Sequence, residues 1–198
     1  MKLKTLIPLC GLLAAGTSFG ATGIFGSYVD IFTTTSTVYK GENFSSKANF
    51  QGASLGTFDL TDTLIITQSQ IDTFKNSGGN VTGAEINYRV YLTAGSPGGY
   101  ITESYNWQSD ANYNDIGGVS ITGSGDQAWG STADINLNPG VAGDYTVEVF
   151  FKAFTNEGDR FSNNGGSNFK ATFTVVPEPA SAALGLLGTV LLLRRRRF

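Results

Sequence analysis

Strict alternation of apolar and polar side chains late in the chain is the feature that most restricts its fold. In DYTVEVFFKAF, residues 144–154, one face carries Tyr145, Val147, Val149, Phe151 and Ala153. In NFKATFTV, residues 168–175, one face carries Phe169, Ala171, Phe173 and Val175. Successive side chains of a strand point to opposite faces, so each stretch predicts an antiparallel strand with one buried face.

Other segments have the composition of strands, because they are rich in Thr, Tyr, Phe, Val and Ile and are separated by Gly and Asn clusters. The clearest is AEINYRVYLT, residues 84–93. Weaker candidates are residues 27–34, 36–41, 55–60, 62–70, 100–107, 118–123 and 131–137. Only residues 68–76 could form a helical turn. This pattern predicts an all-β fold, an antiparallel β-sandwich of jelly-roll or immunoglobulin-like Greek-key type.

A turn precedes the first of these strands in NPGVAGDY, residues 138–145. Tyr145 follows Gly143 by two residues, which resembles the tyrosine corner of Greek-key sandwiches. In that motif the tyrosine hydroxyl donates a hydrogen bond to the upstream backbone. An ordinary buried tyrosine after a turn is the alternative.

The N-terminus has the composition of a targeting segment. A basic start precedes an apolar stretch, residues 6–15, and the small residues Ser18 and Gly20 suit cleavage before Ala21. This pattern predicts a secretory signal peptide, residues 1–20, which forms a signal helix and directs the chain to the Sec translocon.

The C-terminal segment, residues 177–198, has three parts in order: Pro177, Glu178 and Pro179; an apolar run, residues 180–193; and Arg194, Arg195, Arg196 and Arg197. A helix of the apolar run would be about 21 Å long, against ~30 Å of bilayer hydrocarbon. The arginines resist translocation and stay in the cytoplasm. The segment therefore predicts a short hydrophobic helix that anchors weakly in a fixed direction.

This C-terminal segment resembles the PEP-CTERM sorting signal of Gram-negative bacteria that make extracellular polysaccharide. The resemblance implies that an exosortase in the inner membrane recognises the segment and cleaves the protein there, so that membrane insertion is transient. It also implies that the mature protein is at the cell surface or in the extracellular matrix. A plain C-terminal membrane anchor is the alternative.

The body between the two ends, residues 21–176, has the length of one domain. It contains no cysteine or histidine, so its core must be stable without disulfides. It carries 15 acidic and 7 basic side chains, a net charge of −8, which disfavours nucleic acid as a partner.

Four stretches of the body, GASLGTFDL, INYRVYLTAGSPGGY, AGDYTVEVFFKAF and NNGGSNFKATFTV, are similar to a β-sandwich module of secreted proteins in Bacteroidetes and Verrucomicrobia. This resemblance implies a fold and an exported location, and it implies no activity.

The residue types of the body restrict its chemistry. Without histidine or cysteine it has neither a histidine-based triad nor a zinc site of the usual ligands. Glu103 and Glu148 are among the carboxylates that could pair for glycoside hydrolysis, but nothing marks two of them as partners. We therefore expect a non-enzymatic protein that needs no cofactor.

DANYNDIGG, residues 110–118, is the best metal-site candidate. Asp110, Asn112 and Asn114 alternate as the oxygen ligands of calcium loops do, and Asp115 adds a fourth donor. The stretch is not an EF-hand, because Asp115 stands where that loop requires glycine. A polar surface turn without a metal is the alternative.

Four aromatic residues near the middle of the chain, Trp107, Trp129, Tyr105 and Tyr113, lie among Gly, Ser and Asn. Aromatic rings stack on the C–H faces of sugars while polar groups bind the hydroxyls, so these residues are candidates for glycan binding. The alternative is that the tryptophans belong to the core. Phe150 and Phe154, on the outer face of their strand, form a second apolar patch.

Two functions follow from these patterns. The first is an exported structural or adhesive protein that an exosortase sorts. The second is a carbohydrate-binding module, assisted by calcium, with exopolysaccharide as its partner.

Overall fold

The computed structural model of the chain describes residues 21–42, 45–76, 78–110, 116–118 and 123–178. The twelve strands among them are β1 (Thr22–Phe32), β2 (Ser36–Lys40), β3 (Ala48–Asn49), β4 (Ala53–Asp59), β5 (Ile65–Lys75), β6 (Val81–Leu92), β7 (Ile101–Asp110), β8 (Asp126–Ser131), β9 (Ile135–Asn136), β10 (Gly143–Thr155), β11 (Arg160–Ser162) and β12 (Phe169–Val176). Within the described residues the only helical segment is a single 3-10 turn, η1 (Asn164–Gly166). The predicted all-β class is confirmed. Both predicted flanking helices lie outside the described residues.

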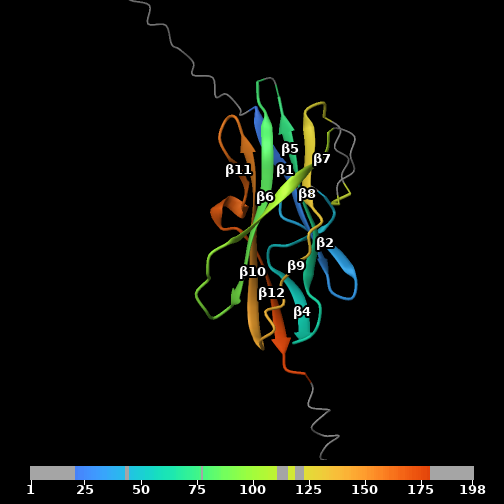
Figure 1. The fold of residues 1–198 in the computed structure, drawn as a ribbon, viewed down its shortest axis with the longest axis vertical. Helices are drawn as coiled ribbons and strands as arrows, with labels where there is room; N and C mark the ends of the chain where they lie inside the picture. The colour runs from blue at the N-terminus through green and yellow to red at the C-terminus, as the bar shows by residue number, and fades with distance from the viewer. Residues whose placement is uncertain (1–20, 43–44, 77, 111–115, 119–122, 179–198) are drawn as a thin grey trace, which may run out of the picture.

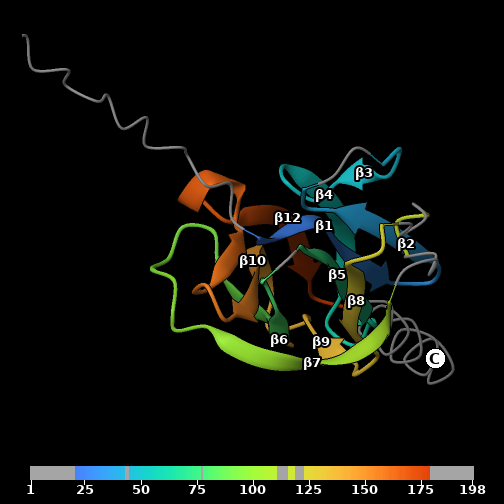
Figure 2. The same ribbon diagram turned by 90° about the horizontal axis from the view of Figure 1, so that it is seen from above.

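All twelve strands belong to one sheet, whose main path runs in the order β3-β2-β1-β5-β8-β7-β6-β10-β12-β4. β7 connects the two halves of the sheet, because its first part pairs with β6 and its second part with β8. It crosses obliquely from one half to the other (Figure 1). Viewed from above, the sheet curves round into a nearly closed, barrel-like form (Figure 2).

The two ends of this path, β3 and β4, are consecutive in the chain and are joined by residues 50–52. The link bonds to a strand on each side. The Phe50 amide donates to the Lys40 carbonyl of β2 at 2.8 Å, and the Gly52 amide donates to the Lys170 carbonyl of β12 at 2.7 Å. β3 and β4 pair in parallel with β2 and β12, whereas every other ladder among the described strands is antiparallel.

The interior is lined by the alternating residues that the sequence singled out. The five apolar residues of β10 and the four of β12 are all buried, as predicted: Tyr145, Val147, Val149, Phe151, Ala153, Phe169, Ala171, Phe173 and Val175. Ile71 of β5 and Ile86 of β6 pack in the same cluster from the other walls. Side chains therefore fill the space inside the curved sheet.

Tyr145 also makes the predicted corner contact. Its hydroxyl donates to the Val141 carbonyl at 3.0 Å, and its ring stacks on Phe173 with the centroids 5.4 Å apart. This bond connects the loop before β10 to the beginning of that strand.

Two elements differ from the sequence-based predictions. Residues 68–76, considered for a helical turn, lie mostly in β5, which pairs with β1 on one side and β8 on the other. Hydrogen bonding along both edges of β5 outweighs the local sequence preference of this segment. β8 itself was not predicted. The candidate strand at residues 118–123 falls largely on residues that the structure does not describe.

Candidate functional site

The last strand leads directly into the predicted sorting signal. β12 ends at Val176, which still pairs with Asp59 of the neighbouring β4. Pro177 follows, and Thr61 Oγ1 donates to Glu178 Oε1 at 3.2 Å. The Glu178 carboxylate therefore contacts the turn after β4. Pro179 and residues 194–197 lie outside the described residues.

The turn after β4 is held by several hydrogen bonds. The Asp62 amide donates to the Asp59 carbonyl at 3.1 Å, and the Asp59 amide donates to Asp62 Oδ2 at 2.8 Å. Asn138 Nδ2 lies within hydrogen-bond distance of the Asp59, Leu60 and Asp62 carbonyls, at 3.3, 3.3 and 2.8 Å. These contacts fix the backbone that carries Thr61.

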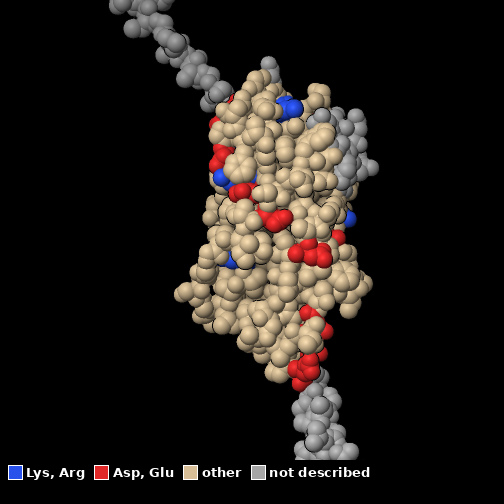
Figure 3. Space-filling view, in the orientation of Figure 1, with Lys and Arg blue, Asp and Glu red and all other residues tan. Residues whose placement is uncertain are grey.

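Acidic side chains gather at this end of the molecule (Figure 3). Two open hollows flank the turn, with volumes of about 470 and 450 Å³, and Thr61, Asp62 and Thr63 line both. Pro177 and Glu178 thus lie beside a fixed acidic turn.

The candidate glycan-binding residues are split between the surface and the interior. Trp107 is 54% exposed, whereas Trp129 is 9% exposed and Tyr105 is 6% exposed. Tyr113 lies outside the described residues. Trp107 and Trp129 are register partners across β7 and β8, so both leave the sheet on one face. Only Trp107 of the three described residues presents most of its ring to solvent.

Two buried polar atoms on this part of β8, Trp129 Nε1 and Gln127 Oε1, have no hydrogen-bond partner among the described residues. Gln127 is 5% exposed. Burial raises the pKa of the nearby Tyr105 hydroxyl far above its ordinary value, and the charge of Glu103 adds to this shift. The wall beneath Trp107 therefore holds polar groups in a poorly solvated place.

The calcium candidates cannot be assembled into a site here, because Asn112, Asn114 and Asp115 lie outside the described residues. Asp110 is the last residue of β7. Across the described part of the chain, no group of three or more Asp, Glu, Cys or His residues is placed to hold a metal ion.

The most extensive polar network lies on the outer face of β6, β10 and β12, and its centre is Glu148, with 3% of its side chain exposed. Arg89 donates to Glu148 Oε2 through Nε at 3.1 Å and Nη2 at 2.8 Å. Tyr91 donates to the same oxygen at 3.2 Å. Oε1 accepts from Tyr100 at 2.6 Å and from Asn168 at 2.8 Å. Five donors therefore compensate one buried carboxylate.

These contacts determine the protonation of the network. Burial by itself would raise the pKa of Glu148, but hydrogen bonds from Tyr100, Asn168 and Arg89, together with the charge of Arg89, lower it to about 2. Burial and the hydrogen bond to Glu148 raise the pKa of Tyr100 to about 12. The network is thus ionised at Glu148 and neutral at Tyr100 over the whole neutral range, which suits a structural clamp.

Sequence reasoning did not identify this network. Glu148 of β10 and Arg89 of β6 lie directly opposite each other in the strand register. The signal available in the sequence was therefore one acidic residue on one strand and one basic residue on another. Arg89 also lies over the Tyr100 ring, 4.2 Å from its centroid. The segment between β6 and β7 is thereby held against the sheet.

The second apolar patch is partly covered by the same segment. The Tyr100 ring meets Phe150 edge-on, with the centroids 5.0 Å apart, and Phe161 of β11 lies 6.4 Å from Phe150. Lys152 Nζ lies 4.3 Å from the centroid of Phe154. Phe161 remains 50% exposed, so this face presents one aromatic ring to solvent.

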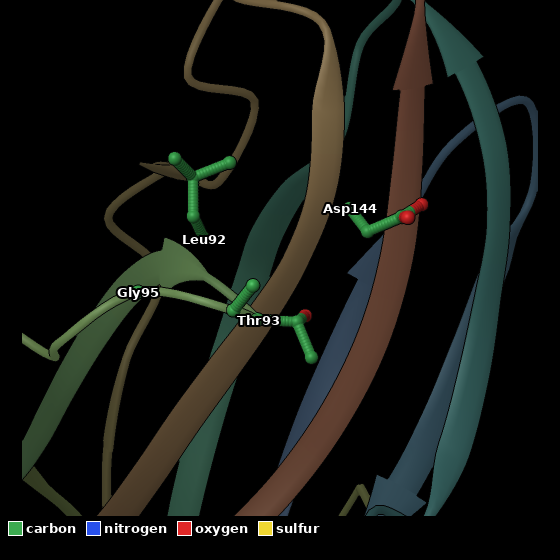
Figure 4. Close-up of a pocket in the computed structure, with 5 residues that line it drawn as sticks. Leu92, Thr93, Gly95 and Asp144 are labelled. Carbon is green, nitrogen blue, oxygen red and sulfur yellow. The ribbon is translucent and has the colours of Figure 1, made fainter.

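A further open hollow of about 430 Å³ lies where β6 ends and β10 begins, lined by Leu92, Thr93, Ala94, Gly95 and Asp144. The labelled side chains of Leu92 and Asp144 do not point toward one another (Figure 4). Asp144 Oδ1 accepts from Thr174 Oγ1 at 2.7 Å. The hollow lacks the converging polar groups that a small-molecule site uses.

No model of a known protein family matches this chain, and a search of curated proteins finds no significantly similar sequence. In the part of the chain that the structure describes, no helix has the length and apolar character that a membrane crossing needs.

Proposed function

We propose that this chain is an exported, non-enzymatic protein with a structural or adhesive role, delivered to the cell surface or the extracellular matrix by an exosortase. The observation that carries the proposal is the placement of the signal. Pro177 follows the last residue of β12 directly, and the apolar run and the arginines complete the signal in order.

In this proposal the Sec translocon exports the chain until residues 180–193 enter the inner membrane. Arg194 to Arg197 keep the C-terminus in the cytoplasm. Pro177 and Pro179 prevent helix from continuing into the body, so they leave an extended segment that an enzyme can bind. Cleavage then frees a body that is already folded.

Intact-mass measurement of the mature protein tests this proposal. We expect the isolated surface or released form to lack Arg194 to Arg197. A mature protein that retains Arg197 would disprove exosortase processing and favour a plain membrane anchor.

The proposal also relates the barrel-like sheet to Greek-key sandwiches. The hydrogen bond from the Tyr145 hydroxyl to the Val141 carbonyl supports this relation. β7, which pairs with both halves of the sheet, would then be the strand that passes from one layer to the other.

A second candidate function is glycan binding at Trp107. Its exposed indole supports this function. An exposed ring suits stacking on the C–H face of a sugar in a neutral segment of exopolysaccharide. A calcium-assisted form would use Asp110 and the residues that follow it.

A glycan array separates the two functions. Saturable binding of a particular sugar that is lost in Trp107→Ala would support the binding module. Phe161→Ala is the matched control, because Phe161 is similarly exposed, at 50% against 54% for Trp107, and belongs to a different face. If neither the wild type nor the control binds any glycan, the structural or adhesive role stands alone.

A further inference from the structure

We propose that the turn after β4 holds the sorting signal against the body, and that Thr61 controls how readily the signal is released to the processing enzyme. This inference rests on the proposed function. It assigns a role in sorting to a residue that lies more than a hundred positions before the signal in the sequence.

The parallel pairing of β4 and β12 brings the two segments together. The register pairs Val175 with Phe58 and Val176 with Asp59, so both strands end at the same level of the sheet. Two residues further along each chain, Thr61 and Glu178 meet through their side chains. The contact is therefore a consequence of the fold.

The turn offers a fixed position for this contact. Asn138 Nδ2 bonds its carbonyls, the Asp62 amide donates to the Asp59 carbonyl, and the Asp59 amide donates to the Asp62 carboxylate. A donor on a fixed backbone loses little conformational freedom when it binds a carboxylate, so the bond is more favourable than one between two mobile side chains.

Thr61 supplies the side-chain donor of this contact. Its neutral hydroxyl donates to Glu178 Oε1 at 3.2 Å, whereas the neighbouring Asp62 carboxylate accepts from the Asp59 amide. Without the Thr61 hydroxyl, Glu178 loses this hydrogen bond to the turn, which favours a detached signal.

Holding Glu178 reduces the fraction of chains in which the signal is free. An enzyme that reads the carboxylate of Glu178 must first displace Thr61, and its apparent affinity falls in proportion to the free fraction. The contact thus delays processing of a chain whose last strand has already paired with β4. An incompletely folded body makes no such contact.

The test follows removal of the C-terminal arginines over time in a Gram-negative host that contains an exosortase, with intact-mass analysis of the full-length chain. Thr61→Val removes the donor and keeps the shape. We expect it to speed processing about two- to fivefold, the effect of losing one exposed hydrogen bond to a charged group. Thr61→Ser keeps the hydroxyl and should process at the wild-type rate. Thr63→Val, in the same loop, is the matched control and should also be unchanged.

Each outcome decides between the two proposals. An unchanged or slower rate in Thr61→Val would overturn the role of Thr61 and leave the sorting function intact. Equal acceleration in Thr61→Val and Thr63→Val would also overturn it, because loop packing would then be responsible. A wild-type chain that never loses Arg197 would remove the sorting function and this inference with it. Melting temperatures of the three variants show whether the body is folded in each case.

Discussion

Glu148 shows what a charged side chain needs in order to lie beneath the outer surface of a sheet. An ionised carboxylate loses several kcal/mol of hydration free energy when it is buried. Hydrogen-bond donors and a counter-charge must compensate for this loss. The Arg89 guanidinium supplies two of them in a forked geometry, and Tyr91, Tyr100 and Asn168 supply the rest. The network connects β6, β10 and β12 with the segment that carries Tyr100.

We expect Glu148→Gln to lower the free energy of unfolding by about 3 kcal/mol, because it leaves Arg89 without its counter-charge in a poorly solvated place. Urea denaturation at pH 7 measures the loss. Glu157→Gln is the control, since its ion pair with Arg160 is partly exposed and should contribute less than about 1 kcal/mol. Equal losses in the two variants would contradict the special role of Glu148.

The same residue makes stability depend on pH in the acid range. Because the folded-state pKa of Glu148 is lowered to about 2 from its ordinary 4.5, its contribution is fully present above the ordinary value and is lost as the pH falls toward 2. The difference in unfolding free energy between the wild type and Glu148→Gln should therefore shrink between pH 5 and pH 2. A difference that stays constant over this range would show that Glu148 does not titrate as described.

At the scale of elements, the alternating strands were predictable because their own inner-facing residues are almost all apolar. β10 and β12 have clean period-two patterns, and every inner residue is buried. β8 was missed because its sequence, DQAWGS, contains Gly, Asp and Gln, and all six residues are nevertheless at least half-buried. Their burial comes from neighbours on both sides, which local propensity does not contain.

The candidate sites divide in the same way, into features visible in the local sequence and contacts that depend on neighbouring strands. The order of the proposed sorting signal from Pro177 onward is visible in the sequence, because a segment of this kind is defined by residues consecutive in the chain. The contacts of Thr61 with Glu178 and of Arg89 with Glu148 depend on which strands pair and in what register. Local patterns do not specify register between distant strands, so neither contact was predicted.

Gly130 of β8 tests how closely the strands of this wall approach one another. A Cβ atom at this position would lie 2.8 Å from the Ser69 carbonyl oxygen of β5, and backbone cannot move aside as a flexible side chain can. We expect Gly130→Ala to lower the unfolding free energy by about 1–3 kcal/mol. Thermal unfolding monitored by circular dichroism measures this loss.

Gly99→Ala is the control for that substitution, since nothing lies within 4 Å of a Cβ at Gly99. Its melting temperature should stay near that of the wild type. If Gly130→Ala were equally harmless, the pairing of β5 with β8 would be looser than described.

At the scale of the whole molecule, the net charge of the body affects the stability of the folded state. The body has a net charge of −8, and such an excess destabilises the compact state through self-repulsion. We expect the melting temperature at pH 7 to rise when sodium chloride is increased from 10 to 500 mM, because the ions screen this repulsion. Sodium sulfate at the same ionic strength separates screening from anion effects. A melting temperature that falls with both salts would show that attractive ion pairs dominate instead.

The link between β3 and β4 has a consequence for self-association. An open sheet ends in rows of unsatisfied amides and carbonyls, which recruit strands from other molecules and start fibrils. Here the Phe50 and Gly52 amides each bond one carbonyl, that of Lys40 in β2 and that of Lys170 in β12. The short link thus bridges the two ends of the sheet and leaves fewer free edge groups where a strand of a neighbouring copy could add.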